Sequence, residues 1–411
     1  MNPGSMLGSG DGAARTPALL KLVRARNVYT PEPVGGQNIL IGGGKILTIG
    51  SELPPATLPN GMVEVVTLPK GKLIPGLIDQ HQHFIGGGEG DGFDARMPEL
   101  NPEAIAGAGI TTAVGLLGTE IEAKSLTQLM RKAAELERAG LSTYIYTGAM
   151  SLPAPHLTQS VGSDIALIEK VIGAKSAIAE RAFPNLDFAA FASLAGALVR
   201  ARATTGKSAV LHLHVGRLRQ GLEPLFELID RIGFPPEQAV PTHINRSDEI
   251  SPLFKQGIKF AKDGGNIDFT CCLGPKDNIA SGIDVLDAVR RALDAGAPHD
   301  RITLSSDAGV AVPDPRERSG FRAVPPSILF RDLKRLAMEG GLGWASALPL
   351  VTSNVARVLG LSGRKGHIAR GMDADLVLIG EDDEIAWVMS AGEVIFSNLD
   401  EGLHFRETER T

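Results

Sequence analysis

Residues 76–83 read Gly76-Leu77-Ile78-Asp79-Gln80-His81-Gln82-His83 and end an apolar run that begins near Leu73. Successive side chains on an extended strand point to opposite faces, so His81 and His83 are expected to project the same way. Two imidazoles on one side of a buried strand can chelate a divalent transition metal. A His-x-His triplet alone is more often a packing or surface feature. The metal interpretation therefore depends on what accompanies the pair.

The composition is that of a globular protein with a substantial core. The 411 residues exceed one typical domain but suit a large α/β barrel with an appendage. Hydrophobic residues make up 43% of the chain and charged residues 21%. The formal net charge is −6 and no basic run occurs, so the sequence lacks the electrostatic footprint of a nucleic-acid-binding protein.

The cysteine content and the apolar runs bear on the cellular compartment. The two cysteines, Cys271 and Cys272, are adjacent and cannot form a disulfide framework, which fits a reducing compartment. The first sixteen residues are rich in Gly, Ser and Ala and do not resemble a secretory signal. No apolar stretch approaches the roughly 18 residues needed to span a bilayer. We expect a cytoplasmic protein with no membrane partner.

The two ends of the chain share one sequence pattern, short β-rich segments separated by turns. Residues 19–49 alternate short β-rich segments with Pro and Gly turns, as antiparallel hairpins do. Similar segments return at residues 375–379 and 393–396. We expect the two ends to form one small β-sandwich, with the middle of the chain inserted between them. The expected boundaries are residues 1–73 and 363–411 for the sandwich and 74–362 for the inserted domain.

The middle of the chain repeats a strand-then-helix unit, which is typical of a parallel sheet with crossover helices. Helical apolar spacing occurs at residues 128–139, 222–232 and 284–295, and the long segment 328–361 would close the barrel. We therefore predict an α/β fold, a (β/α)8 TIM barrel. Its candidate strands end near His83, Gly115, Thr147, Ile178, His214, His243, Cys271 and Asp307.

Polar residues are concentrated at these strand ends, which in such barrels carry the functional groups. Burying imidazole, amine and carboxylate groups together is costly without compensation, and a metal centre is the simplest compensation. The residues concerned are His81, His83, Lys175, His212, His214, His243 and Asp307.

The order of these residues resembles the signature of the amidohydrolase superfamily with two metals. The local motifs are most similar to those of bacterial isoaspartyl (β-aspartyl) dipeptidases, and the resemblance covers nearly the whole chain after the first twenty residues. It implies a barrel of the amidohydrolase type with a small β-sandwich. The motifs that carry it are residues 75–83, 86–89, 114–119, 241–246, 303–307 and 371–377.

The resemblance implies two zinc ions per subunit, which share a hydroxide that attacks the scissile carbonyl. Lys175 would bridge them as a carbamate (N6-carboxylysine), so burial beside two cations must lower its pKa from the usual value of about 10.4. Asp307 would accept a proton from the attacking water and deliver it to the departing amine; a helix N-cap is the structural alternative. The implied ligands are His81, His83 and Asp307 for one zinc, and His214 and His243 for the other.

The resemblance also implies a dipeptide substrate linked through an aspartate side chain. Glu89 would accept the substrate ammonium and Thr119 would add a hydroxyl contact. Arg246, with Arg181 as a second candidate, would bind a substrate carboxylate through its forked guanidinium. The alternative for each arginine is a surface or helix-capping charge.

The chain departs from the family pattern in three places. The turn before Glu89 is one glycine shorter, Met150 stands where the family has a tyrosine that stabilises the oxyanion, and Ala311 stands where it has a serine. Losing a positioned oxyanion donor typically costs about 10²–10³ in turnover. Either another group replaces the tyrosine, with Tyr146 and His156 as candidates, or the preferred substrate differs.

Three functions are therefore compatible with the sequence. The first is a zinc-dependent hydrolase of β-aspartyl dipeptides, and the second is a related hydrolase of a cyclic amide or an N-acyl amino acid. The third is a non-catalytic assembly protein, which would be expected to have lost metal ligands. Family members form homo-oligomers, which we also expect here. His212 is expected to be a supporting or core residue, and Lys170 a surface charge.

Overall fold

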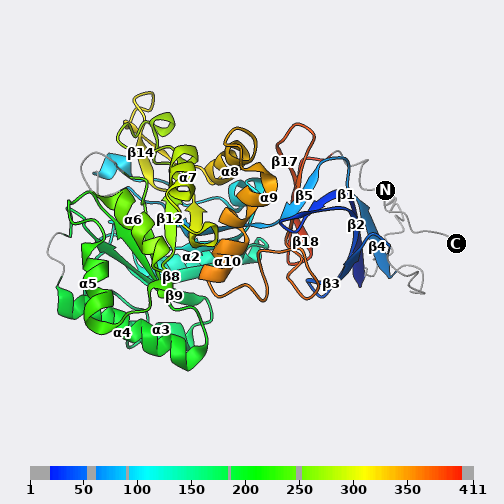
Figure 1. Cartoon of the computed structure of the whole chain (residues 1–411). Helices are drawn as coiled ribbons and strands as arrows, with labels where there is room; N and C mark the ends of the chain where they lie inside the picture. Colours follow the sequence, from blue (N-terminus) through cyan, green and yellow to red (C-terminus); the bar gives the residue numbers. More distant parts are fainter. Residues whose placement is uncertain (1–18, 53–61, 89–91, 184–186, 247–251, 400–411) are drawn as a thin grey trace, which may run out of the picture.

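The computed structural model describes residues 19–52, 62–88, 92–183, 187–246 and 252–399. They form a barrel covered by helices and, beside it, a smaller sheet built from both chain ends (Figure 1). Glu89 lies outside the described residues. Within the described part of the chain, no helix has the length and apolarity needed to cross a membrane.

Both ends of the described chain contribute to one eight-stranded sheet, as the sequence predicted. Its order is β18-β17-β16-β5-β1-β2-β3, with β4 beside β1. The two ends meet where β16 pairs antiparallel with β5, opposing Val377 and Ile74. The strands are β1 (Leu20–Tyr29), β2 (Pro33–Gly42), β3 (Lys45–Gly50), β4 (Val63–Thr67), β5 (Lys72–Pro75), β16 (Leu376–Ile379), β17 (Ile385–Ser390) and β18 (Glu393–Ser397).

This terminal sheet has a core of its own, separate from that of the barrel. Val23, Ile39 and Trp387 are fully buried in it. An ion pair stands at its junction with the barrel, where the buried Lys365 amine lies 3.0 Å from Asp373 Oδ2 and 2.6 Å from Asp375 Oδ2. The junction therefore combines sheet pairing with a buried charge network.

Eight parallel strands form the predicted barrel. Six pair in the order β11-β10-β9-β8-β7-β6, and β12 pairs with β13. The His83 amide donates to Ala308 O at 2.8 Å and links β6 to the end of β13, while the Ile244 amide donates to Asp268 O at 3.3 Å and links β11 to β12. The strands are β6 (Leu77–Gln82), β7 (Ile110–Gly115), β8 (Ser142–Gly148), β9 (Val171–Ile178), β10 (Val210–Val215), β11 (Ala239–Thr242), β12 (Ile267–Thr270) and β13 (Ile302–Ser305).

The helices lie around the outside of the barrel (Figure 1). In α2 the buried residues include Leu129, Ala133 and Leu136, spaced three to four apart. A capping box between Ser125 and Gln128 fixes where this helix begins. The helices are α1 (Pro102–Gly107), α2 (Leu126–Arg138), α3 (Val161–Leu167), α4 (Phe188–Thr205), α5 (Glu223–Ile232), α6 (Leu253–Lys262), α7 (Val285–Asp294), α8 (Ile328–Met338), α9 (Gly343–Ala347) and α10 (Ser353–Val358).

Short elements complete the connections. Beyond the end of β13, the hairpin of β14 and β15 pairs Val312 with Arg322. These strands are β14 (Ala311–Pro313) and β15 (Phe321–Ala323), and the 3-10 turns are η2 (Phe93–Ala95), η3 (Pro236–Gln238), η4 (Pro275–Asp277), η5 (His299–Arg301) and η6 (Leu348–Val351).

Candidate metal centre

Six side chains from five strand ends line one cavity of about 670 Å³ at the carboxyl end of the barrel. Two come from β6 or the residue just after it, one each from β9 and β10, and one each from the residues that follow β11 and β13. These six are the ones that the sequence singled out as ligands: His81, His83, Lys175, His214, His243 and Asp307.

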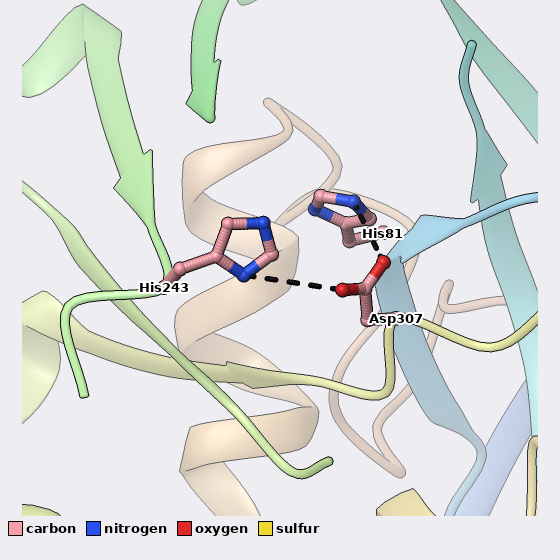
Figure 2. A group of neighbouring side chains, drawn as sticks. All are labelled: His81, His243 and Asp307. Atoms are coloured by element: carbon pink, nitrogen blue, oxygen red, sulfur yellow. Dashed lines mark ion pairs between the residues drawn. The ribbon is translucent and has the colours of Figure 1, made fainter. Parts of the chain in front are cut away.

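Asp307 lies at the centre of one half of this group. Its Oδ1 lies 3.2 Å from His81 Nε2 and 3.2 Å from His83 Nε2. The Lys175 amine is 3.4 Å from His81 Nε2. Two ring nitrogens therefore face one carboxylate oxygen, and the Lys175 amine lies beside one of these rings. Figure 2 shows His81 and Asp307 pointing toward one another, with a dashed line for their contact.

His214 and His243 form the other half. His214 Nδ1 and His243 Nε2 lie 3.1 Å apart. His243 also faces Asp307, whose Oδ2 is 4.0 Å from His243 Nδ1 (Figure 2). Three possible ligand atoms lie within 4.8 Å of one another, one from each of His81, His243 and Asp307, and this group could hold a metal ion.

Each of the four imidazoles also has a polar neighbour at its second ring nitrogen. Such partners fix the tautomer and the orientation of a ligating histidine, so that the other nitrogen presents its lone pair. The pairs are His81 Nδ1 with His212 Nε2 at 2.9 Å, His83 Nδ1 with Glu120 Oε1 at 3.6 Å, His214 Nε2 with Glu180 Oε2 at 3.0 Å, and His243 Nδ1 with Thr270 Oγ1 at 2.7 Å.

Burial controls the protonation of most of these groups. Desolvation lowers the pKa of His81 to about 3 and that of His214 to about 4, and it holds the pKa of His243 well below its usual range. It also lowers the pKa of the Lys175 amine to about 7. The three imidazoles are therefore neutral near pH 7, which is the form that binds a metal ion.

His83 differs from the other three imidazoles. Burial disfavours its charge as well, but the contacts with Asp307 and Glu120 outweigh burial and raise its pKa to about 9. Burial likewise disfavours charge on Asp307, yet His81 and His83 hold the pKa of Asp307 well below its usual range. The centre therefore contains a carboxylate that stays ionised.

The donor set fits a divalent metal. Imidazole nitrogens and carboxylate oxygens are common zinc ligands. Several buried polar atoms here also lack a hydrogen-bond partner among the described residues, including His83 Nδ1 and Asp307 Oδ1. Unsatisfied buried polar groups are rare and call for an explanation such as an ion.

Three of the four residues expected to bind substrate lie along the same cavity: Thr119, Arg181 and Arg246. The Nε atom of Arg246 is buried with no hydrogen-bond partner in the described part of the chain, whereas Arg181 is exposed. Glu89, the fourth, cannot be placed because it is outside the described residues.

Met150 and Ala311, two of the three departures from the family pattern, both line the cavity. Neither candidate replacement for the missing tyrosine does so within the described chain, so both suggestions were wrong. Tyr146 is fully buried and stacks on His212, with ring centroids 4.8 Å apart. His156 is exposed and lines a different hollow. Both residues were suggested because their side chains can form hydrogen bonds, but that capacity does not determine where a side chain points.

Sequence reasoning missed four residues near the centre: Glu120, Glu180 and Arg217, which line the cavity, and Thr270, which contacts His243. Glu120 and Glu180 closely follow β7 and β9, so the strand-end rule that found the histidines could have found them. Arg217 follows β10 in the same manner.

Both cysteines are unbonded, buried thiols. Burial raises the pKa of Cys271 and Cys272 well above the usual value. Cys272 lines the cavity.

Comparison with known proteins agrees with this geometry. Residues 73–395 match the family model described as "Amidohydrolase family". A β-aspartyl dipeptidase from the keratin-degrading thermophile Fervidobacterium islandicum AW-1, crystallised with β-Asp-Leu, is 34% identical with a TM-score of 0.82. A second structure of the dipeptidase from that organism is 33% identical, also with a TM-score of 0.82. Both alignments cover 93% of this chain and 100% of the other.

A more distant structure shares the fold alone. Dihydropyrimidinase from Brevibacillus agri NCHU1002 is 17% identical with a TM-score of 0.65, over 92% of this chain and 95% of that one. The family match covers well over half of the sequence, and the resemblance expected from the motifs is confirmed. The chain therefore belongs to the amidohydrolase family, as an isoaspartyl dipeptidase-like member.

Proposed function

We propose that this protein hydrolyses β-aspartyl dipeptides at a centre of two divalent metal ions, with zinc as the native metal. The convergence of four imidazoles, one amine and one carboxylate on a single cavity supports the metal centre. The similarity to a dipeptidase that was crystallised with β-Asp-Leu supports the substrate.

In this proposal the six side chains divide into two ligand sets. His81, His83 and Asp307 would hold one ion, because their facing atoms are 3.2 Å apart. His214 and His243, whose Nδ1 and Nε2 atoms face each other at 3.1 Å, would hold the other. When bound, the two ions would acidify water and polarise the scissile carbonyl.

Lys175 would join the two sets as a carbamate. Within the described residues, the hydrogen bond to His81 is the one polar contact of its amine. Burial favours the neutral amine, which attacks carbon dioxide and loses one proton to give N6-carboxylysine. The product is an anion with two oxygens, so it can bridge where a plain lysine cannot.

Asp307 would carry the proton. Its Oδ1 faces His81 and His83, which leaves Oδ2 to accept a proton from the attacking water. The same oxygen would then donate that proton to the departing amine, without which an amide does not cleave. An ionised aspartate at the start suits this role, and contacts with His81 and His83 keep Asp307 ionised against the effect of burial.

The substrate would be oriented by charge. The guanidinium of Arg246 would bind a carboxylate of the dipeptide through paired hydrogen bonds, with Arg181 as a second contact from the cavity rim. Thr119 would add a hydroxyl, and Glu89 would receive the ammonium.

A second candidate is the hydrolysis of another small amide, such as a cyclic amide or an N-acyl amino acid. Met150 and Ala311, which line the cavity, favour it because neither side chain can donate a hydrogen bond to a developing oxyanion.

The test combines metal analysis with a substrate panel. Purified protein is analysed for bound metal and assayed for aspartate release from β-Asp-Leu, with α-Asp-Leu, a cyclic amide and an N-acetyl amino acid alongside. We expect two metal ions per chain and turnover of β-Asp-Leu but not α-Asp-Leu. Turnover of the cyclic amide with β-Asp-Leu inert would reject the dipeptidase, and protein without metal or turnover would favour the non-catalytic alternative.

A further inference from the structure

Glu120 lies on the side of His83 that faces away from Asp307. His83 Nε2 is 3.2 Å from Asp307 Oδ1, and its other nitrogen, Nδ1, is 3.6 Å from Glu120 Oε1. Glu120 follows β7, and only 3% of its surface is exposed. The Gly118 amide donates a hydrogen bond to Glu120 Oε1 at 3.1 Å and helps to orient the carboxylate.

The chain leaves room for this contact at a glycine. A Cβ atom on Gly118 would lie 2.6 Å from His83 Cε1 and 2.8 Å from Glu120 Oε2, and both distances are shorter than side chains tolerate. The backbone of Gly118 is not in the left-handed region, so space rather than conformation explains the glycine here. Gly118 therefore lets the carboxylate and the imidazole approach each other.

Both partners are incompletely satisfied. Among the described residues, His83 Nδ1 and Glu120 Oε2 are buried without a hydrogen-bond partner. At 3.6 Å the two groups form an ion-pair contact but are too far apart for a hydrogen bond. A shift of less than about 1 Å would bring them to the 2.7–2.9 Å of a charge-assisted hydrogen bond.

We propose that Glu120 is a positioning residue that holds His83 for metal binding and sets the affinity of the ion on that side of the centre. This inference rests on the proposed function, because it assumes that His83 is a ligand. A carboxylate that accepts from Nδ1–H fixes the tautomer in which Nε2 has the free lone pair, and it makes that nitrogen more basic. Loss of such a partner typically weakens metal binding by about 10–100-fold.

The test uses the full-length protein stripped of metal and titrated with Zn²⁺ against a chromophoric chelator. We expect Glu120→Gln to weaken one of the two Zn²⁺ affinities by about 10–100-fold, and Glu120→Asp, which keeps the charge on a shorter side chain, to restore part of it. The matched control is Glu122→Gln, which removes an equal charge from an exposed position two residues away and should bind Zn²⁺ as the wild type does.

Melting temperatures separate positioning from a general structural role. Glutamine at position 120 keeps the volume of the side chain but removes one partner of a buried ion-pair contact, so the readout is how far Zn²⁺ raises the melting temperature of the Glu120→Gln variant above that of the same variant without metal. Its gain in melting temperature on adding Zn²⁺ should be smaller, because stabilisation by a ligand follows its affinity. A Gly118→Ala variant provides a second perturbation that retains the carboxylate, and it should weaken Zn²⁺ binding as well.

Two results would overturn the proposal while the proposed function stands. One is a Glu120→Gln protein that binds both Zn²⁺ ions as tightly as wild type. The other is a raised KM for β-Asp-Leu with unchanged Zn²⁺ affinity, which would make Glu120 a substrate contact instead. A wild-type protein that binds no Zn²⁺ would reject the proposed function itself, and this inference with it.

Discussion

Replacement of Asp307 by asparagine tests the proposed proton transfer with little disturbance of the fold. The backbone of Asp307 has a φ of 57°, in the left-handed region that few residues other than glycine, asparagine and aspartate adopt readily. Asparagine therefore suits both the conformation and the volume of the site. It retains one oxygen that can face His81 and His83, 3.2 Å away, but it cannot accept and return a proton.

The expected effect is on turnover rather than on metal content. A positioned acid–base group contributes about 10²–10⁴ to the rate, which corresponds to about 2.7–5.4 kcal/mol on the barrier at 1.36 kcal/mol for each factor of ten. We therefore expect Asp307→Asn to lower kcat for aspartate release from β-Asp-Leu by at least two orders of magnitude. The assay uses saturating substrate and excess Zn²⁺, with bound metal measured on the same sample.

The matched control is Asp383→Asn. Asp383 also has a positive φ, 59°, but it lies in the terminal sheet module, where it pairs with Lys72 at 2.9 Å. This variant should keep wild-type kcat. Metal-replete Asp307→Asn with near-normal kcat would refute the assignment of Asp307 as the proton carrier.

Three further predictions concern the ligand bridge, the substrate contact and the domain junction. Lys175→Ala should lose bound metal and activity together, with partial recovery of both when a short-chain carboxylate is added; undiminished metal content would argue against a bridging lysine. Arg246→Lys should raise KM for β-Asp-Leu more than it lowers kcat, because an ammonium cannot form the paired hydrogen bonds of a guanidinium; an unchanged KM would exclude the contact. Lys365→Met leaves the carboxylates of Asp373 and Asp375 buried without this partner. It should therefore lower the free energy of unfolding by about 3–5 kcal/mol, measured by urea denaturation. A loss below about 1 kcal/mol would show that these ion pairs contribute little to stability.

Local sequence patterns were sufficient to predict the barrel and its polar rim. Every residue of β9 is buried, Lys175 and Ser176 included, as expected of a parallel strand that is covered on both faces. The predicted strand ends lie within two residues of the observed ones. Since the carboxyl ends of all strands meet at one rim, finding those ends was enough to bring His81, Lys175 and Asp307 together.

Side-chain direction within the barrel was harder to predict. His212 and His214 are two residues apart and point the same way from β10, but His212 lies behind His81 and stacks on Tyr146, while His214 lines the cavity. Depth along a strand depends on the tilt and closure of the barrel, which no short pattern encodes. For that reason the sequence suggested Tyr146 as an oxyanion donor although the structure buries it away from the cavity.

The sequence by itself determined the class of fold, the order of the strands and the residue types at the rim, because hydrophobic period and run length are local properties of the chain. Tertiary structure alone decided which partner each imidazole meets: Glu120 lies 37 positions along the chain from its partner His83, and Glu180 lies 34 positions from His214. Contacts of this kind depend on the closure of eight strands and on space left at positions such as Gly118. Such distances are set by the packing of the whole barrel.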